Sequence, residues 1–269
     1  MTRLVLLADL HFGSVPQGLE DLLLNDLVTQ APDAALIAGD LTMRASSSEY
    51  AEARRWLDRL PIDRLIVPGN HDIPKFNLVK RFTRPFHRFE RIVREEERDP
   101  VSLKRCHVVG LNTVAPWQPH LRWQEGRVRR RTVQALTLEM SQTPQDKLRI
   151  VVAHHPFAKV PEVKRARPVR RAISMLDAFH ANRVDLVLSG HTHQSFVLPI
   201  RNEDNHLVAI GAPTALSSRT RGEENGYWLI DLMPERIVLT RRLREGGAFI
   251  AGPERIFPVR EGALHLDAD

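Results

Sequence analysis

The sequence has a single cysteine and lacks any long apolar stretch. Cys106 alone cannot form an internal disulfide, and so low a cysteine content is typical of a protein from a reducing compartment. No stretch is long enough to span a bilayer, and Asp9 and His11 interrupt the apolar run near the N-terminus. No small-residue cleavage site follows that run. We therefore expect a cytoplasmic protein without a membrane-spanning helix or a cleaved leader.

Internal repeats, low-complexity tracts and flexible linkers are also missing. The 269 residues, 42% of them hydrophobic, suffice for one large α/β domain with a buried core. We expect a single domain over residues 1–269 rather than two small ones. The formal net charge of +6 is compatible with an anionic partner. A solvated, arginine-rich surface explains the charge equally well.

Apolar runs alternate with helical spacing along the first seventy residues. Residues 19–28 have the spacing of an amphipathic helix, and Ser46 can cap a second helix that extends to Leu60. Buried strands are predicted at residues 3–8, 34–38 and 64–67. This succession of strands and helices indicates right-handed βαβ units and a largely parallel sheet.

The pattern continues and then changes. Further strands are predicted at residues 106–112, 148–153 and 184–189, and the arginine-rich segments 122–131 and 164–171 each precede a predicted helix. From residue 195 onward the sequence has short β runs separated by polar turns. We expect those runs to form a second, mostly antiparallel sheet, with strands near 195–200, 206–210, 226–232, 236–243 and 254–259.

Residues 73–99 differ from both parts and predict a basic, aromatic helical insertion beside the sheet. Four phenylalanines lie there among lysines and arginines, at positions Phe76, Phe82, Phe86 and Phe89. Packing is the more common role of such aromatic residues, so we expect them to anchor the insertion. The cations can steer an anionic substrate or contact acidic lipid.

Acidic, amide and imidazole side chains follow five of the predicted strands. Ligand sites of α/β proteins lie at the carboxyl ends of strands, where loops project from a rigid sheet. In extended chain, residues at positions i and i+2 point the same way, so Asp9 with His11, and His191 with His193, can each grip one ion. The candidate metal ligands are Asp9, His11, Asp40, Asn70, His154, His191 and His193.

The composition of this set indicates its chemistry. Imidazole and carboxylate without thiolate suit Zn, Mn or Fe and argue against a structural zinc site of the cysteine type. Seven ligands exceed the needs of one four-coordinate ion, whereas two ions sharing a carboxylate would use them all. A lone Asp or His after a strand is usually a cap or a turn residue. Five strand ends with the same pattern favour a metal site.

The spacing of these motifs resembles the calcineurin-like metallophosphoesterase superfamily over residues 9–193. The matching motifs are Asp9-x-His11, Gly39-Asp40, Gly69-Asn70-His71-Asp72, His154 in Ala-His-His-Pro, and Gly190-His191-Thr192-His193. Within the superfamily, the chain is most similar to the bacterial branch of cyclic-nucleotide phosphodiesterases and glycerophosphodiesterases. The His-His-Pro element and residues 211–217 support that branch.

The resemblance implies a fold and a mechanism. The fold is a four-layer α/β/β/α sandwich of two mixed β-sheets flanked by helices. One ion would be held by Asp9, His11, Asp40 and His193, and the other by Asp40, Asn70, His154 and His191. Such ions, roughly 3.5–4 Å apart, lower the pKa of a shared water and supply a hydroxide that attacks the phosphodiester. His71 would be the catalytic proton donor or oxyanion stabiliser, with Asp72 orienting it.

One position departs from many relatives. Met43 occupies the place where protein phosphatases carry a further Asp, so the usual carboxylate support for His71 is missing or comes from elsewhere. This weakens an assignment as a protein phosphatase. Arg219, Arg221 and Asn225 lie in a late loop and can reach the site, although a solvated turn explains them equally well.

We therefore expect a small anionic phosphoester, preferably a phosphodiester, as the substrate. Nucleic acid is a less favoured substrate because the chain has no DNA-binding appendage. A nucleotide-linked or pyrophosphate lipid at the membrane surface is an alternative that rests on the basic insertion, with peripheral membrane contact. A non-catalytic scaffold is disfavoured because all seven ligand types are present. The sequence leaves the oligomeric state open.

Overall fold

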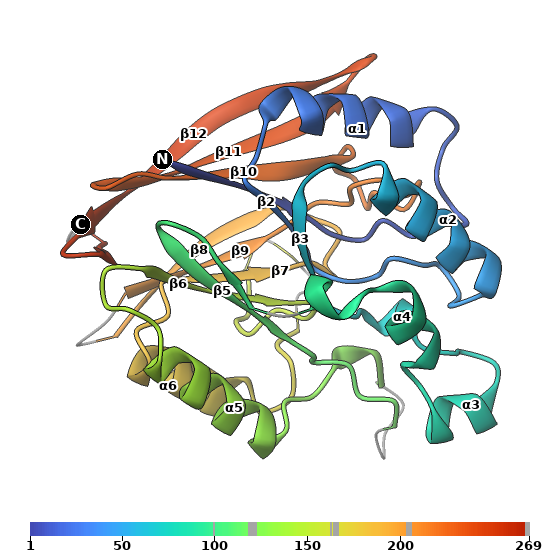
Figure 1. The fold of residues 1–269 in the computed structure, drawn as a ribbon, viewed down its shortest axis with the longest axis horizontal. Coiled ribbons are helices and arrows are strands. Elements are labelled where there is room, and N and C mark those ends of the chain that lie inside the picture. The colour runs from blue at the N-terminus through green and yellow to red at the C-terminus, as the bar shows by residue number, and fades with distance from the viewer. Residues whose placement is uncertain (99, 118–122, 162, 164–166, 203–205, 267–269) are drawn as a thin grey trace.

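Two β-sheets lie face to face, and helices cover the outer side of each sheet (Figure 1). The structure is a computed structural model that describes residues 1–98, 100–117, 123–161, 163, 167–202 and 206–266. Both sheets contain parallel and antiparallel pairs. The predicted four-layer α/β/β/α sandwich of two mixed sheets is confirmed.

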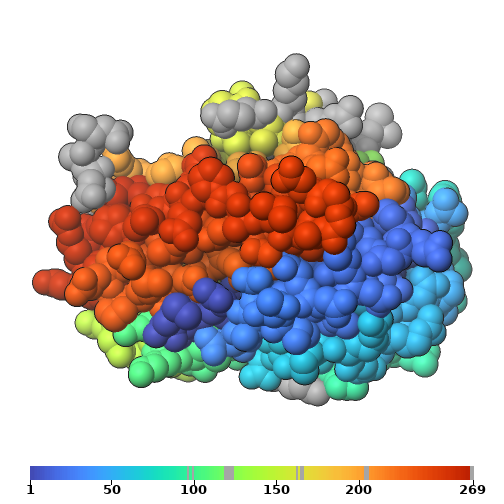
Figure 2. Space-filling view, turned by 90° about the horizontal axis from the view of Figure 1, so that it is seen from above, coloured from blue at the N-terminus to red at the C-terminus, as the bar shows by residue number. Residues whose placement is uncertain are grey.

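The first sheet begins with three parallel strands and is extended by antiparallel ones. Its order is β13 (Ala263–Leu264), β12 (Ala248–Arg260), β11 (Arg236–Glu245), β10 (Gly226–Leu232), β1 (Thr2–Leu7), β2 (Ala34–Ile37), β3 (Asp63–Ile66). Helices α1 (Leu19–Gln30) and α2 (Ser47–Asp58) cover its outer face, and α1 lies beside β12 (Figure 2). Ser46 caps α2 as predicted, in a reciprocal capping box with Glu49.

The second sheet contains four parallel strands with an antiparallel strand at each edge. Its order is β4 (Val101–Ser102), β5 (Cys106–Leu111), β6 (Leu148–Ala153), β7 (Leu186–Ser189), β9 (His206–Gly211), β8 (Phe196–Arg201). Helices α5 (Arg130–Ser141) and α6 (Ala172–Ala181) cover its outer face.

The expected assembly of the late strands into one separate sheet is wrong. Strands β8 and β9 join the second sheet, while β10 to β13 extend the first sheet beyond β1. The alternation of short β runs shows that strands form, but it does not specify which exposed strand edge each one pairs with.

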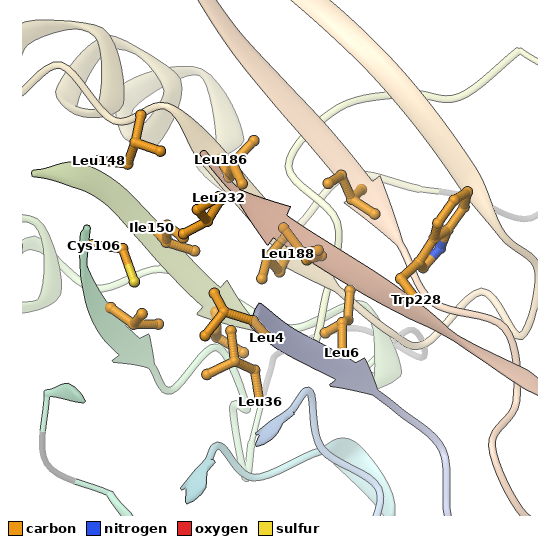
Figure 3. Packing of buried hydrophobic residues seen from close by; sticks show 14 of the residues in the cluster. Leu4, Leu6, Leu36, Cys106, Leu148, Ile150, Leu186, Leu188, Trp228 and Leu232 are labelled. Atoms are coloured by element: carbon orange, nitrogen blue, oxygen red, sulfur yellow. The ribbon is translucent and has the colours of Figure 1, made fainter. Parts of the chain in front are cut away.

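The strands are apolar on both sides because each sheet is covered on both faces. In β1, Leu4 and Leu6 pack between the sheets, whereas Val5 and Leu7 face the helices. Figure 3 shows the layer between the sheets, where Leu4 and Leu36 meet Ile150 and Leu188. This rigid core fixes the positions at which the strands end.

The segment after β3 contains short helices. They are η1 (Asn70–Asp72), α3 (Leu78–Thr83), α4 (His87–Ile92) and η2 (Glu95–Glu97), and a further one, η3 (Trp123–Glu125), follows β5. Among the described residues, no helix combines the length and the apolar character needed to cross a membrane. Residue 99 at the end of the predicted insertion, residue 122 and residues 164–166 of the two arginine-rich segments lie outside the described residues.

The expectation that the phenylalanines of the insertion act as packing anchors is only partly met. Phe89 is buried against α2 and the first sheet, and Phe86 is half-buried. Phe76 and Phe82 are exposed. The sequence spacing alone did not separate these two pairs, because all four have similar basic neighbours.

Candidate metal centre

The loops after five strands meet at one edge of the sandwich and bring all seven predicted ligands together. Asp9 and His11 follow β1, Asp40 follows β2, and Asn70 begins η1 after β3. His154 follows β6, and His191 and His193 follow β7. Both sheets therefore contribute side chains to the same buried volume.

The first cluster consists of Asp9, His11 and His193. The Oδ1 atom of Asp9 lies 3.6 Å from Nε2 of His11 and 3.5 Å from Nε2 of His193. The two imidazole rings are nearly parallel, with centroids 5.3 Å apart. Three ligand atoms thus surround one point, which is the arrangement that a divalent ion requires.

The second cluster consists of Asn70, His154 and His191. The Oδ1 atom of Asn70 lies 3.1 Å from Nε2 of His154 and 3.0 Å from Nδ1 of His191. Asp40 stands between the two clusters, because its Oδ2 atom is 3.5 Å from Nε2 of His154 and 3.7 Å from Nε2 of His11. A carboxylate in this position could serve ions in both clusters.

Unpartnered polar atoms test whether the site suits a cation. Asp9 Oδ1 and His11 Nε2 are buried, and neither has a hydrogen-bond partner among the described residues. A buried acceptor without a partner is costly unless a ligand satisfies it. With the mixed oxygen and imidazole donors around them, these two atoms fit a divalent metal ion.

In three of the histidines, the Nδ1 atom, which points away from the centre, is held by a neighbouring hydrogen-bond acceptor. Nδ1 of His11 lies 3.2 Å from the Thr42 carbonyl, and Nδ1 of His154 lies 2.8 Å from the Ala38 carbonyl. Because a carbonyl only accepts, each Nδ1 carries the proton and each Nε2 presents its lone pair to the centre.

Thr214 orients the third imidazole, and the sequence reasoning missed its role. Its hydroxyl lies 2.8 Å from Nδ1 of His193 and donates to the Arg219 carbonyl at 3.1 Å. Because the hydroxyl proton is donated to the Arg219 carbonyl, the hydroxyl oxygen accepts a hydrogen bond from Nδ1 of His193. The Nε2 atom of His193 is then free to face the cluster. The predicted ligand His193 was the available signal, since such a ligand needs a partner on its other nitrogen.

The backbone at the ligands is unusual. Asp9, His11, Asp40, His191 and His193 all have positive φ, between 46° and 70°. Left-handed conformations are uncommon for residues with a side chain and gather at functional sites. The expectation that the two i, i+2 pairs lie in extended chain is therefore wrong, although each pair does converge.

The charges in the centre favour metal binding. Burial alone would raise the pKa of Asp9, but the imidazoles of His193 and His11 hold it below its usual value. Burial lowers the pKa of His193 to about 4 in spite of Asp9, and it lowers the pKa of His191 strongly. Asp9 is thus charged, and burial favours neutral His191 and His193, which are the forms that bind a metal ion. His11 differs, because Asp9 and Asp40 outweigh its burial and raise its pKa.

Asp72 holds the loop of the Gly69-Asn70-His71-Asp72 motif and does not orient His71 as expected. Its carboxylate accepts the backbone N–H groups of Gly69, Leu41 and Thr42 at 2.9, 3.2 and 3.0 Å. Gly69 is required here by close contact, because a Cβ at this position would lie 2.1 Å from Oδ1 of Asp40. The two loops after β2 and β3 are therefore joined through Asp72.

His71 is oriented by a backbone carbonyl. Its Nδ1 lies 2.7 Å from the carbonyl oxygen of Met43, the residue that replaces the usual Asp. The Nε2 atom lies 3.3 Å from a guanidinium nitrogen of Arg219, which can only donate. His71 therefore has its proton on Nδ1 and an accepting Nε2, and burial lowers its pKa.

The other two residues expected near the site differ from each other. Asn225 is buried and donates to the carbonyls of Thr214 and Ser217, so it supports the loop instead of reaching the centre. Arg221 is exposed, and its charge contributes to lowering the pKa of His191 and His193. Its positive charge therefore acts on these two imidazoles.

His155 is a neighbour of the second cluster but is not free to bind an ion. Its Nε2 lies 2.7 Å from the Gln124 carbonyl, and its Nδ1 lies 2.8 Å from the Thr113 hydroxyl. Both nitrogens are thus occupied within the protein. The second His of the Ala-His-His-Pro motif fixes the loop that carries His154.

Comparison with known proteins agrees with this geometry. Residues 2–195 match the family described as calcineurin-like phosphoesterase. The chain belongs to this family. The family uses divalent metal ions, and this chain has candidate ligands for them in the two clusters beside Asp40.

Among curated relatives, this calcineurin-like phosphoesterase is similar to two proteins named "probable cyclic nucleotide phosphodiesterase". The one from Synechococcus sp. is 26% identical over 175 residues, which are 64% of this chain and 62% of the relative. The one from Vesicomyosocius okutanii is 25% identical over 169 residues, or 61% and 63% of the two chains. The chain thus spans less than two thirds of the length of these relatives.

Solved structures of lower identity show the same fold. A dimetal phosphatase from Danio rerio has a TM-score of 0.67 at 13% identity, with 93% of this chain and 98% of that chain covered. A purple acid phosphatase from yellow lupin has a TM-score of 0.59 at 12% identity, with 93% and 52% covered. At such identities the likeness is one of fold.

Proposed function

We propose that this calcineurin-like phosphoesterase hydrolyses a small phosphodiester at a dinuclear centre of Mn, Fe or Zn ions. The observation that carries the proposal is the pair of ligand clusters joined by Asp40, with Asp9 Oδ1 and His11 Nε2 unpartnered. Two ions bound there would lower the pKa of a water and offset negative charge on the phosphoryl oxygens.

The residues around the clusters have separate tasks in this proposal. Asp40 fixes the spacing of the two sites and also accepts the His71 backbone N–H at 2.7 Å. Arg219 presents a guanidinium beside His71, where it can donate to a phosphoryl oxygen. Nε2 of His71 faces the same space and, once protonated, can donate to the departing alkoxide.

The names of the curated relatives support a phosphodiester over a monoester, since both are phosphodiesterases by name. Two arginines at the rim, Arg219 and Arg221, suit a small anionic substrate. Cyclic nucleotides and glycerophosphodiesters are the substrates to test first.

The test combines metal analysis with a substrate screen. Protein purified without chelator should contain close to two divalent ions per chain. With Mn, Fe or Zn it should hydrolyse diesters and cyclic phosphoesters faster than monoesters. Asp40→Asn should lose both the ions and the activity, because one carboxylate serves both clusters.

Asp185→Asn is the matched control, since it removes a buried carboxylate far along β7 from the ligands. It should leave metal content and turnover unchanged. A wild-type protein that holds substoichiometric metal and hydrolyses no phosphoester would overturn the proposal and favour a scaffold. Faster hydrolysis of monoesters would keep the metal site and overturn the phosphodiester assignment.

A further inference from the structure

Five large apolar side chains are exposed at the start of the insertion and in the neighbouring loop after β5. Their exposed fractions are Phe76 78%, Leu78 58%, Val79 73%, Phe82 55% and Trp117 62%. They account for five of the eleven exposed large hydrophobic residues among those described. We call this group the α3 patch because helix α3, at the corner of the molecule, carries three of its five residues (Figure 1). Contiguous exposed apolar residues usually mark an interaction site.

The α3 patch is held in place from beneath. The side chain of Arg81 is buried and donates to the Pro116 carbonyl at 2.7 Å and to the Pro74 carbonyl at 3.0 Å. This joins α3 to the loop after β5, so that Trp117 and Phe82 line the same hollow of about 320 Å³. The hydrogen bonds of Arg81 therefore fix the backbone segments that carry the exposed aromatic side chains.

The charge around the patch has one sign. Residues 73–89 contain no Asp or Glu. Lys75, Lys80 and Arg84 are exposed, and none forms an ion pair within the part of the chain that the structure describes. Lys75 lies 5.5 Å from the ring centroid of Phe76. Free cations thus surround the apolar side chains.

We propose that the α3 patch docks this protein on the surface of an anionic phospholipid bilayer. Aromatic and aliphatic side chains ringed by lysine and arginine are typical of segments that insert into the lipid interface. A second copy of the chain is a poor occupant because its patch carries the same charge. Leu78 and Val79 cannot stack on bases, which disfavours nucleic acid.

Docking would also orient the candidate centre. Lys75 follows His71 by only four residues, and η1 leads directly into the patch. A membrane bound at the patch would therefore lie next to the segment that carries His71. This inference does not depend on the proposed phosphodiesterase activity.

The experiment measures sedimentation of the full chain with vesicles. Vesicles of 30% phosphatidylserine in phosphatidylcholine, at low salt, are compared with vesicles of phosphatidylcholine alone. The wild-type protein should sediment with the anionic vesicles, and added salt should weaken binding. The triple variant Phe76→Ser, Val79→Ser, Phe82→Ser should bind at least tenfold less. Charge reversal of Lys75, Lys80 and Arg84 to Glu should lower binding by about fivefold per cation or more.

A matched control removes exposed apolar side chains elsewhere. The control is the double variant Leu138→Ser, Ile173→Ser. Leu138 on α5 is 63% exposed and Ile173 on α6 is 77% exposed, and their replacement should leave vesicle binding unchanged. Equal melting temperatures and metal contents of all variants show that the fold is retained.

Three outcomes would overturn the proposal. The first is absence of wild-type binding to anionic vesicles at low salt, and the second is equal binding by the serine triple variant. The third is binding of something other than a membrane at the α3 patch. Either the wild type would be a dimer and the triple variant a monomer, or the wild type would bind a single-stranded oligonucleotide tightly and vesicles not at all.

Discussion

Two buried carboxylates at opposite ends of the strands show how differently this fold treats the same side chain. Asp9 follows the carboxyl end of β1, and Asp185 precedes the amino end of β7. Burial raises the pKa of Asp185 to about 6. The backbone N–H groups of Leu264 and Arg149, each 2.8 Å from the carboxylate, lower the pKa but only partly offset the effect of burial. At Asp9 the surrounding imidazoles outweigh burial, and the pKa is lowered.

The partners explain the contrast. Asp185 satisfies two backbone donors and thereby ties β7 to residues near the C-terminus. Asp9 uses Oδ2 to accept the His191 backbone N–H at 3.0 Å, while Oδ1 has no partner. An acid with every acceptor used holds structure, whereas an acid with a free, charged oxygen is prepared for a ligand.

The largest effect should come from Asp9→Asn. The substitution removes the charge but keeps the size, so the chain should fold without loss of melting temperature in the metal-free state. We expect metal retention and turnover to fall by more than about 100-fold, which exceeds the usual effect of a residue outside the ligand set. Isothermal titration with Mn or Zn, beside Asp185→Asn, measures the difference. Metal affinities that fall equally in both variants would remove the contrast.

The next effect concerns His71→Ala. The ions should remain, because His71 is no part of either cluster, while turnover of an alkyl phosphodiester should fall by roughly 10²-fold or more. The loss should be smaller for bis(p-nitrophenyl) phosphate, whose leaving group needs no proton. Steady-state rates with metal content measured in parallel test this. Equal losses on the two substrates would count against proton donation.

The pH dependence of stability should report Asp185. Its pKa is 3.8 when unfolded and about 6 when folded, so between those values the folded protein holds a proton that the unfolded chain has released. The contribution of Asp185 to stability should therefore fall as pH rises across this window and level off above it, by on the order of 3 kcal/mol. Asp72, with its pKa raised to about 6, and buried histidines such as His193, with its pKa lowered to about 4, titrate in the same range. The contribution of Asp185 is therefore read from urea unfolding between pH 4 and 7 as the difference between the wild type and Asp185→Asn, and equal slopes in the two proteins would contradict it. A slope that persists in the variant belongs to other groups.

The smallest effect is expected for Thr214→Val. It keeps the shape but removes the hydroxyl that orients His193, so the first cluster should bind its ion about 10–100-fold more weakly. The second cluster should be unaffected. Stepwise metal titration distinguishes one weakened site from two. Thr220→Val, in the same loop, serves as a control of similar size.

The sequence predicted which side chains meet at the centre better than it predicted their surroundings. Apolar runs that end in Asp, Asn or His fix where side chains leave a rigid sheet, and the seven candidates do meet. The roles of the Met43 carbonyl and the Thr214 hydroxyl could not be predicted, because backbone groups and distant loops leave no pattern. The pairing of β10 with β1 was missed for a similar reason, since strand propensity carries no information on the partner.

Each ligand cluster draws on both layers of the sandwich. Asp9 and His11 come from the first sheet and His193 from the second, while Asn70 meets His154 and His191 across the same division. A cation in either cluster would link side chains of the first sheet to side chains of the second sheet. Chelation would then be felt well beyond the centre, as a loosening of one half against the other and a lower melting temperature.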